Sequence, residues 1–190
     1  QGVGVAAVGD PHLRAVQHEG IATAILGPNP AATLTTPNGA HLKAGDPVIT
    51  YVARNLEPYR GIHTFLRMLE QVQKKHKTAH ALIVGGNGVS YGSRPKDAPN
   101  WREHLLKEVK LDPARTHFVG KLPRAQYLRV LHASAVHCYF TYPFVLSWSL
   151  LEAMACGALI VGSDTAPVRE VIRDGHNGRL AGFFEVPQLA

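Results

Sequence analysis

The chain has 190 residues, of which 45% are hydrophobic and 18% charged, and its formal net charge at pH 7 is +6. This composition is ordinary for a soluble globular protein of one or two domains, and the length suffices for a core without disulfide bridges. The two cysteines form no CxxC pair, no run of 18 apolar residues occurs and no signal peptide is visible, so we expect no zinc motif, no membrane-spanning helix and a reducing cytosol. The positive charge favours an anionic partner, either nucleic acid or a phosphorylated small molecule.

The first 45 residues differ from the rest and are rich in turn signals. They contain "GPNP" and "TPNG", and the second predicts a small hairpin around Asn38 and Gly39, with arms at residues 33–36 and 41–43. The abrupt opening "QGVGVAAVGD" is interpreted as the start of a fragment. We therefore divide the chain into an arm or linker, residues 1–45, and a domain, residues 46–190.

Apolar strands alternate with amphipathic helices from Asp46 onward. The pattern predicts strands at 48–53, 80–86, 116–120, 135–141 and 158–164, and helices at 62–75, 101–110, 124–134, 148–156 and 166–174. Wholly apolar strands separated by such helices indicate a doubly wound α/β domain, with a parallel sheet covered on both faces. Ligands of these domains bind beyond the carboxyl ends of the strands. The loops that follow the five strands are therefore the candidate site.

The loop after the first strand, "ARNLEPYRGI", carries two arginines close to a helix N-terminus. Arg54 and Arg60 could clamp a diphosphate, because a guanidinium binds phosphate through paired donors and the helix end adds positive partial charge. The alternative is a pair of solvated arginines. The next loop, "VGGNGVSYGSRP", is neither G-x-G-x-x-G nor a Walker loop, and an ordinary flexible loop is the favoured interpretation.

The loop after the fourth strand leads into a helix whose first turn has free N–H groups. Ser147 is a candidate cap for this helix, and Glu152 lies about one turn into it. A carboxylate at that place suits the vicinal hydroxyls of a ribose. The alternative is a glutamate on the solvent face of the helix.

Four segments occur in one order: "ARNLEPYRG", "ALIVGGNG", "HFVGKLPRAQYLRVLHASAVHCYF" and "SLLEAMACGALIVGSDTAPVREVIRDGHNGRL". Together they resemble the carboxyl-terminal, nucleotide-sugar-binding domain of retaining GT-B glycosyltransferases, the group-1 glycosyltransferase family. The last segment is the most specific, and the resemblance covers residues 46–190. The segment "HEGIAT" also resembles the chain just past the hinge between the two GT-B domains.

The resemblance implies a role for eight residues. Arg54, Arg60 and the helix start at Ser147, Trp148 and Ser149 would hold the donor diphosphate, whereas Gly120 and Lys121 would lie beside the nucleobase and Glu152 would bind the ribose. Two features depart from the family. Phe144, eight residues before Glu152, stands where the family usually has a second glutamate. At the position of Arg60 the family usually has lysine, and the spacing from Arg54 to Arg60 is one residue longer than the usual spacing between arginine and lysine.

The resemblance also implies the activity. It is retaining transfer of a glycosyl group from a nucleoside diphosphate sugar to a glycan or lipid acceptor, as in bacterial-type polysaccharide or glycolipid synthesis. The acceptor would be bound by an amino-terminal domain that is absent, so we expect this fragment to be inactive alone. No Asp-x-Asp cluster offers a bridging metal, and we expect neither metal nor cofactor. A cytoplasmic location with peripheral membrane contact is expected.

Several other functions share parts of this pattern. A GT-B epimerase acting on a sugar nucleotide would use the same donor pocket, and a non-enzymatic nucleotide-binding module would share the sheet. A nicotinamide oxidoreductase would need G-x-G-x-x-G after the first strand, where this chain has "ARNLEPYRG". A nucleic-acid partner is not expected, because the basic residues are dispersed instead of clustering with aromatics on one face.

Overall fold

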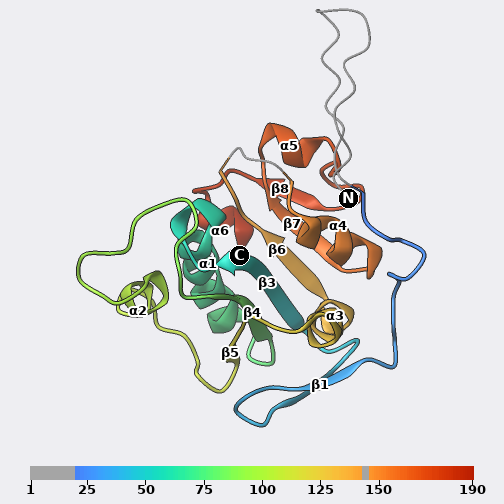
Figure 1. The fold of residues 1–190 in the computed structure, drawn as a ribbon, viewed down its shortest axis with the longest axis horizontal. Coiled ribbons are helices and arrows are strands. Elements are labelled where there is room, and N and C mark those ends of the chain that lie inside the picture. The colour runs from blue at the N-terminus through green and yellow to red at the C-terminus, as the bar shows by residue number, and fades with distance from the viewer. Residues whose placement is uncertain (1–19, 143–145) are drawn as a thin grey trace, which may run out of the picture.

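The computed structural model describes residues 20–142 and 146–190 (Figure 1). Its centre is a six-stranded sheet in the order β5-β4-β3-β6-β7-β8, and every neighbouring pair is parallel. The strands are β3 (Val48–Asn55), β4 (His80–Gly86), β5 (Thr116–Gly120), β6 (Val136–Tyr139), β7 (Leu159–Ser163) and β8 (Arg179–Ala181). The doubly wound α/β fold is confirmed.

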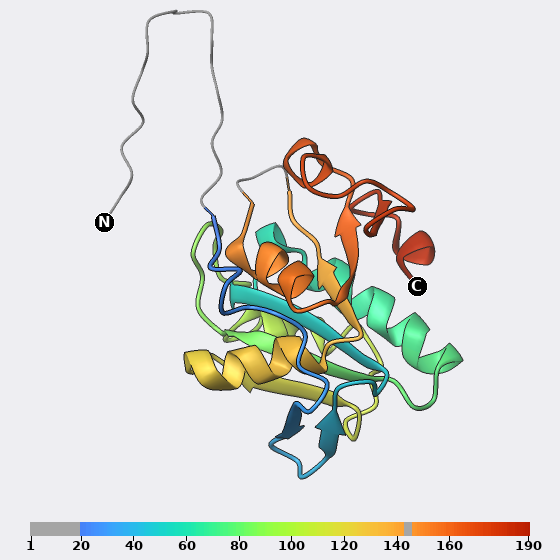
Figure 2. The same ribbon diagram turned by 90° about the vertical axis from the view of Figure 1, so that its right-hand side faces the viewer.

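Helices cover both faces of the sheet (Figure 2). The helices are η1 (Pro58–Arg60), α1 (Ile62–Lys75), α2 (Trp101–Leu105), α3 (Arg124–Ala133), α4 (Trp148–Ala155), α5 (Ala166–Arg169) and α6 (Val186–Leu189). Apolar residues of α1, α2 and α6 join one core cluster, and residues of α3, α4 and α5 join a second. The completely buried face of α1, with Phe65, Leu66 and Leu69 at 0% exposure, explains why the helical periodicity of this segment was so clear.

Two predicted helices end earlier than expected, and one strand was missed. The helix expected at 166–174 stops at Arg169. Beyond this end, the Asn177 side chain accepts the Arg173 N–H at 2.7 Å and donates to the Val171 carbonyl at 2.8 Å. The helix expected at 101–110 stops at Leu105 and continues as turns. Strand β8 has only three residues, "RLA", which form no apolar run that a sequence pattern could reveal.

The predicted hairpin is confirmed as the antiparallel pair β1 (Thr33–Thr35) and β2 (His41–Lys43). It is part of the folded body, because Leu42 belongs to a core cluster with Val48, Leu82 and Val130. Of the hinge-like segment at 18–23, the first two residues lie outside the described part of the chain, and so does Phe144.

At the carboxyl edge of the sheet, the segment that follows β3 makes a tight contact with the segment that follows β6. Gly61 precedes α1 with a φ of 76°, and a Cβ built on it would lie 2.5 Å from both the Cβ and the carbonyl oxygen of Phe140. Only glycine allows both this backbone conformation and this approach. The contact brings the ends of β3 and β6 together.

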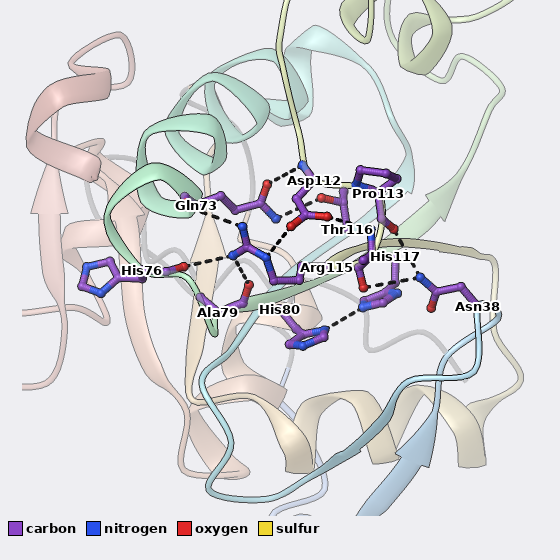
Figure 3. Close-up of polar contacts among 11 residues, drawn as sticks. Asn38, Gln73, His76, Ala79, His80, Asp112, Pro113, Arg115, Thr116 and His117 are labelled. Carbon is purple, nitrogen blue, oxygen red and sulfur yellow. Dashed lines mark hydrogen bonds and ion pairs between the residues drawn. The ribbon is translucent and has the colours of Figure 1, made fainter.

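A network of polar contacts lies at the amino edge of the sheet, opposite the contact between Gly61 and Phe140 (Figure 3). The Arg115 side chain donates to Asp112 at 2.7 Å and to the carbonyls of His76 at 3.0 Å and Ala79 at 3.2 Å. Beside it, the His80 and His117 rings stack, with centroids 5.3 Å apart, and share a 2.9 Å hydrogen bond. This edge of the sheet is therefore held by side-chain contacts.

Candidate functional site

A cavity of about 140 Å³ opens at the carboxyl ends of β3 and β6. Arg54 at the end of β3, Arg60 in η1 and Ser147 before α4 all line it, so the structure brings together three of the predicted site residues. The other lining residues are Tyr51, Val52, Ala53, Tyr91, Cys138, Tyr139, Phe140 and Thr141. Two arginines among the residues that line one small cavity make it suited to an anion with several oxygens.

Arg60 is held on both its backbone and its side chain. Its carbonyl accepts the buried Tyr51 hydroxyl, and its guanidinium carbon lies 5.0 Å from the centre of the Tyr91 ring. Burial raises the pKa of Tyr51 far above its usual value, with the nearby Arg60 charge opposing that shift. The Tyr51 hydroxyl is therefore a neutral donor at all ordinary pH values.

Ser147 caps α4 as predicted. Its Oγ accepts the Ser149 N–H at 3.4 Å and shares a 2.9 Å hydrogen bond with the Ser149 hydroxyl. The Ser147 N–H donates in turn to the Tyr139 hydroxyl at 2.9 Å. Trp148 in the same turn is 58% exposed. Ser147 therefore both caps α4 and lines the cavity, so the first turn of α4 begins at the cavity wall.

Glu152 lies away from this cavity, against α3. It is only 7% exposed, so it is not on the solvent face of α4. Its Oε1 accepts from Arg124 Nη1 and its Oε2 from the Tyr127 hydroxyl, both at 2.6 Å. Burial, together with this carboxylate, raises the pKa of Tyr127. Because each carboxylate oxygen can accept two hydrogen bonds, Glu152 keeps acceptor capacity beyond these two.

Sequence reasoning singled out neither Arg124 nor Tyr127. They stand three residues apart in α3, a spacing that places both on one helical face, and this was the only local signal. Their partner is 25 to 28 residues farther along the chain, so no local pattern could reveal the contact.

Gly120 is the last residue of β5, two strands from β3 in the sheet, and Lys121 follows it. Gly120 has a φ of 68°, and the side chain of Lys121 crosses toward β4, because a Cβ on Gly86 would lie 2.6 Å from the Lys121 Cε. These two residues are at the predicted edge of the sheet but do not line the 140 Å³ cavity.

The glycine-rich loop after β4 takes part in the cavity through Tyr91. The sequence favoured an ordinary flexible loop here. In the structure, the backbone N–H groups of Ser90 and Tyr91 donate to the buried carboxylate of Glu57, a residue that sequence reasoning had passed over. Within residues 20–142 and 146–190, no three His, Cys, Asp or Glu side chains gather as metal ligands do, and no helix is long and apolar enough to cross a bilayer.

The parallel sheet and the arginine-lined cavity at its carboxyl edge define a Rossmann-like α/β domain, the type that forms each half of a GT-B fold. Its family is shown by a family model: residues 46–190 match the one described as Glycosyl transferases group 1, and the chain belongs to that family. The resemblance read from the sequence is confirmed.

Curated relatives match over 133 residues, which is 70% of this chain. An uncharacterized glycosyltransferase of Methanocaldococcus jannaschii is 29% identical, with 31% of its length covered. A phosphatidyl-myo-inositol mannosyltransferase of Mycobacterium tuberculosis is 28% identical, with 32% covered. The chain thus spans about a third of the length of these relatives.

Two solved structures share the fold at low sequence identity. The carboxyl-terminal domain of LpcC, a glycosyl transferase group 1 family protein of Francisella tularensis, has a TM-score of 0.69 at 18% identity, covering 90% of this chain and 84% of that one. Anabaena HepE in complex with UDP-glucose has a TM-score of 0.62 at 22% identity, covering 77% and 37%. The described domain therefore has the fold of the carboxyl-terminal domain of LpcC.

Proposed function

We propose that this chain is the donor-binding domain of a retaining glycosyltransferase, which takes the glycosyl group from a nucleoside diphosphate sugar. The observation that carries the proposal is the convergence of Arg54, Arg60 and Ser147 on one cavity at the carboxyl edge of the sheet. HepE, which shares this fold, was solved with UDP-glucose, and this supports a uridine nucleotide as the first donor to test. The mannosyltransferase relative, named for a phosphatidyl-inositol, supports a lipid-linked acceptor.

Charge builds up on the leaving diphosphate during glycosyl transfer, and this is the step that the cavity would assist. Arg54 and Arg60 carry fixed positive charges, and the N-terminus of the 14-residue helix α1 begins directly after Arg60 and Gly61. Positive groups held in place stabilise such a leaving group without reorganisation. We propose that the two arginines suffice for this and that no metal ion takes part.

The acceptor would be bound by a second domain of the full-length protein. We therefore expect the 190-residue chain to bind the nucleotide without transferring the sugar. Turnover of UDP-glucose onto an acceptor by this chain at an ordinary enzymatic rate would contradict the proposal.

Calorimetric titration with UDP, GDP and ADP tests the donor site. Arg54→Ala and Arg60→Ala should each weaken binding by roughly 1.5 to 3 kcal/mol, because each removes a charged hydrogen-bond donor. A chelator such as EDTA should leave the affinity unchanged. Arg67→Ala is the matched control, because Arg67 is an exposed arginine of α1 paired with Glu108 at 2.8 Å. Unchanged affinity in both cavity variants would show that the diphosphate binds elsewhere.

Glu152 can be tested as a ribose ligand separately from its structural contacts. If its carboxylate accepts the ribose hydroxyls, wild-type protein should prefer UDP to 2′-deoxy-UDP, and Glu152→Gln should reduce that preference. Tyr127→Phe, which removes only the hydroxyl donor at 2.6 Å, should cost roughly 1.5 to 3 kcal/mol of unfolding free energy, because the acceptor is a carboxylate, and should keep the preference. Equal affinities for the two nucleotides in the wild type would rule out the ribose role.

A further inference from the structure

Glu57 is a completely buried carboxylate, 0% exposed, in the turn between β3 and η1. It stands at the N-cap position of η1, but its side chain makes no capping hydrogen bond there. Its two oxygens accept the Ser90 N–H at 3.0 and 3.2 Å, and its Oε2 also accepts the Tyr91 N–H at 3.1 Å. A buried charge is strongly unfavourable unless it is hydrogen-bonded, so the hydrogen bonds from the Ser90 and Tyr91 amides stabilise the buried Glu57 carboxylate.

Other contacts fasten the same two segments together. The Asn55 side chain donates to the Ser90 hydroxyl at 2.7 Å, and the Leu56 N–H donates to the Gly86 carbonyl at 2.8 Å. Gly85 leaves no room for a side chain, because a Cβ there would lie 2.7 Å from Leu56. The turn after β3 and the loop after β4 are therefore packed as one unit, with the Glu57 carboxylate at its centre.

This unit forms one wall of the cavity. The Tyr91 ring centre lies 5.0 Å from the Arg60 guanidinium carbon, and both residues line the cavity together with Arg54. An aromatic face attracts a cation at this distance and restricts the directions in which the guanidinium can point. Because Glu57 binds the Tyr91 backbone, the position of that ring depends on a carboxylate that does not itself line the cavity.

We propose that Glu57 is a positioning residue of the donor site: it holds Tyr91 against Arg60, so that the guanidinium faces the diphosphate. The inference rests on the proposed function and adds to it a residue that acts through others. The loss of Glu57 should therefore weaken binding of the phosphate groups and leave the affinity for the nucleoside almost unchanged.

Glu57→Gln is the first test. The variant keeps one acceptor oxygen but turns an amide NH₂ toward a backbone N–H, so one donor faces another. UDP should bind about 10-fold more weakly by calorimetry, whereas uridine, followed by NMR titration, should change by less than about 2-fold. Asp112→Asn is the matched control, because Asp112 also accepts a backbone N–H, from Ala114 at 2.9 Å, but at the opposite edge of the sheet. A control that weakens UDP equally would show a general structural effect and overturn the proposal.

A double-mutant cycle tests the route through Arg60. If Glu57 acts by orienting this arginine, the Glu57→Gln and Arg60→Ala double variant should bind UDP as weakly as Arg60→Ala alone. Additive losses would overturn the proposal. Tyr91→Ala serves if Glu57→Gln does not fold, because Tyr91 is 47% exposed and its backbone N–H remains. Its UDP affinity should fall about 3-fold or more, and an unchanged affinity would overturn the proposal.

Binding to the wild-type protein distinguishes a failure of the proposed function from a failure of the proposed role of Glu57. If it binds none of UDP, GDP, ADP and inorganic pyrophosphate, the proposed function fails and the role of Glu57 fails with it. If it binds UDP and Glu57→Gln binds UDP equally well, only the role of Glu57 is overturned.

Discussion

Replacing Gly61 by alanine should lower the free energy of unfolding by roughly 2 to 5 kcal/mol. Two costs combine at this position. The backbone has a φ of 76°, a conformation that costs a residue with a Cβ roughly 1 to 2 kcal/mol. The new Cβ would also lie 2.5 Å from the Phe140 Cβ and carbonyl oxygen and 2.8 Å from its carbonyl carbon. None of these atoms is the end of a flexible side chain, so the backbone at the end of β6 must move.

Gly175 is a matched control for the Gly61 prediction. Its φ is 72°, almost the same, but nothing lies within 4 Å of a Cβ built there. Gly175→Ala should therefore show only the conformational cost of roughly 1 to 2 kcal/mol in urea denaturation. Equal losses in the two variants would show that the Phe140 contact does not restrict position 61. Because Arg60 is the adjacent residue, Gly61→Ala should also weaken UDP binding, whereas Gly175→Ala should not.

Acidification from pH 6.5 to 4 should destabilise the fold through two buried histidines. His137 is 0% exposed and His117 is 3% exposed. Burial lowers the pKa of each from 6.5 to about 4, and the neighbouring His80 lowers that of His117 further. The unfolded chain therefore takes up protons below pH 6.5 while the folded chain does not. Each histidine should remove about 1.4 kcal/mol of stability per pH unit across that interval, and the loss should level off below the folded pKa.

The surroundings of these two rings explain why protonation is resisted. The His137 Nδ1 shares a 2.8 Å hydrogen bond with the Thr50 hydroxyl, which in turn contacts the Ser134 hydroxyl at 2.7 Å. No carboxylate is bonded to either histidine in the part of the chain that the structure describes. On the His80 side of His117, the nearby charges are those of Asp112 and Arg115, which pair with each other at 2.7 Å. An imidazolium at either place would be buried without a counter-charge.

Urea denaturation at several pH values measures this effect. His137→Gln should reduce the dependence of stability on pH by the amount that His137 contributes. The carboxylates act in a lower interval. Hydrogen bonds hold the pKa values of Asp112 and Asp164 below the usual 3.8, so their contribution is lost only as the pH falls through those lowered values. Constant stability between pH 6.5 and 4.5 would contradict the histidine prediction.

The amino-acid sequence by itself determined the architecture and one part of the site. The apolar runs of β3, β4 and β5 and the periodicity of α1 are local properties, so they could be recognised without tertiary information. The convergence of Arg54, Arg60 and Ser147 also followed, because the carboxyl ends of parallel strands meet at one edge of the sheet. The three-residue strand β8 could not be recognised, because its place is set by pairing with β7 and not by its own residues.

Only the tertiary structure decided how individual polar side chains are paired. Glu57 meets the Ser90 and Tyr91 amides, and Glu152 meets Arg124 and Tyr127, in each case across more than twenty residues of sequence. A local pattern reports which face of an element is apolar, but it cannot say which distant donor a buried carboxylate will reach. The same limit applies to Gly61, whose neighbour Phe140 is brought against it by strand order. Such partners are chosen by packing, because an unpaired charge or an overlapping atom is unfavourable only once the chain has closed around it.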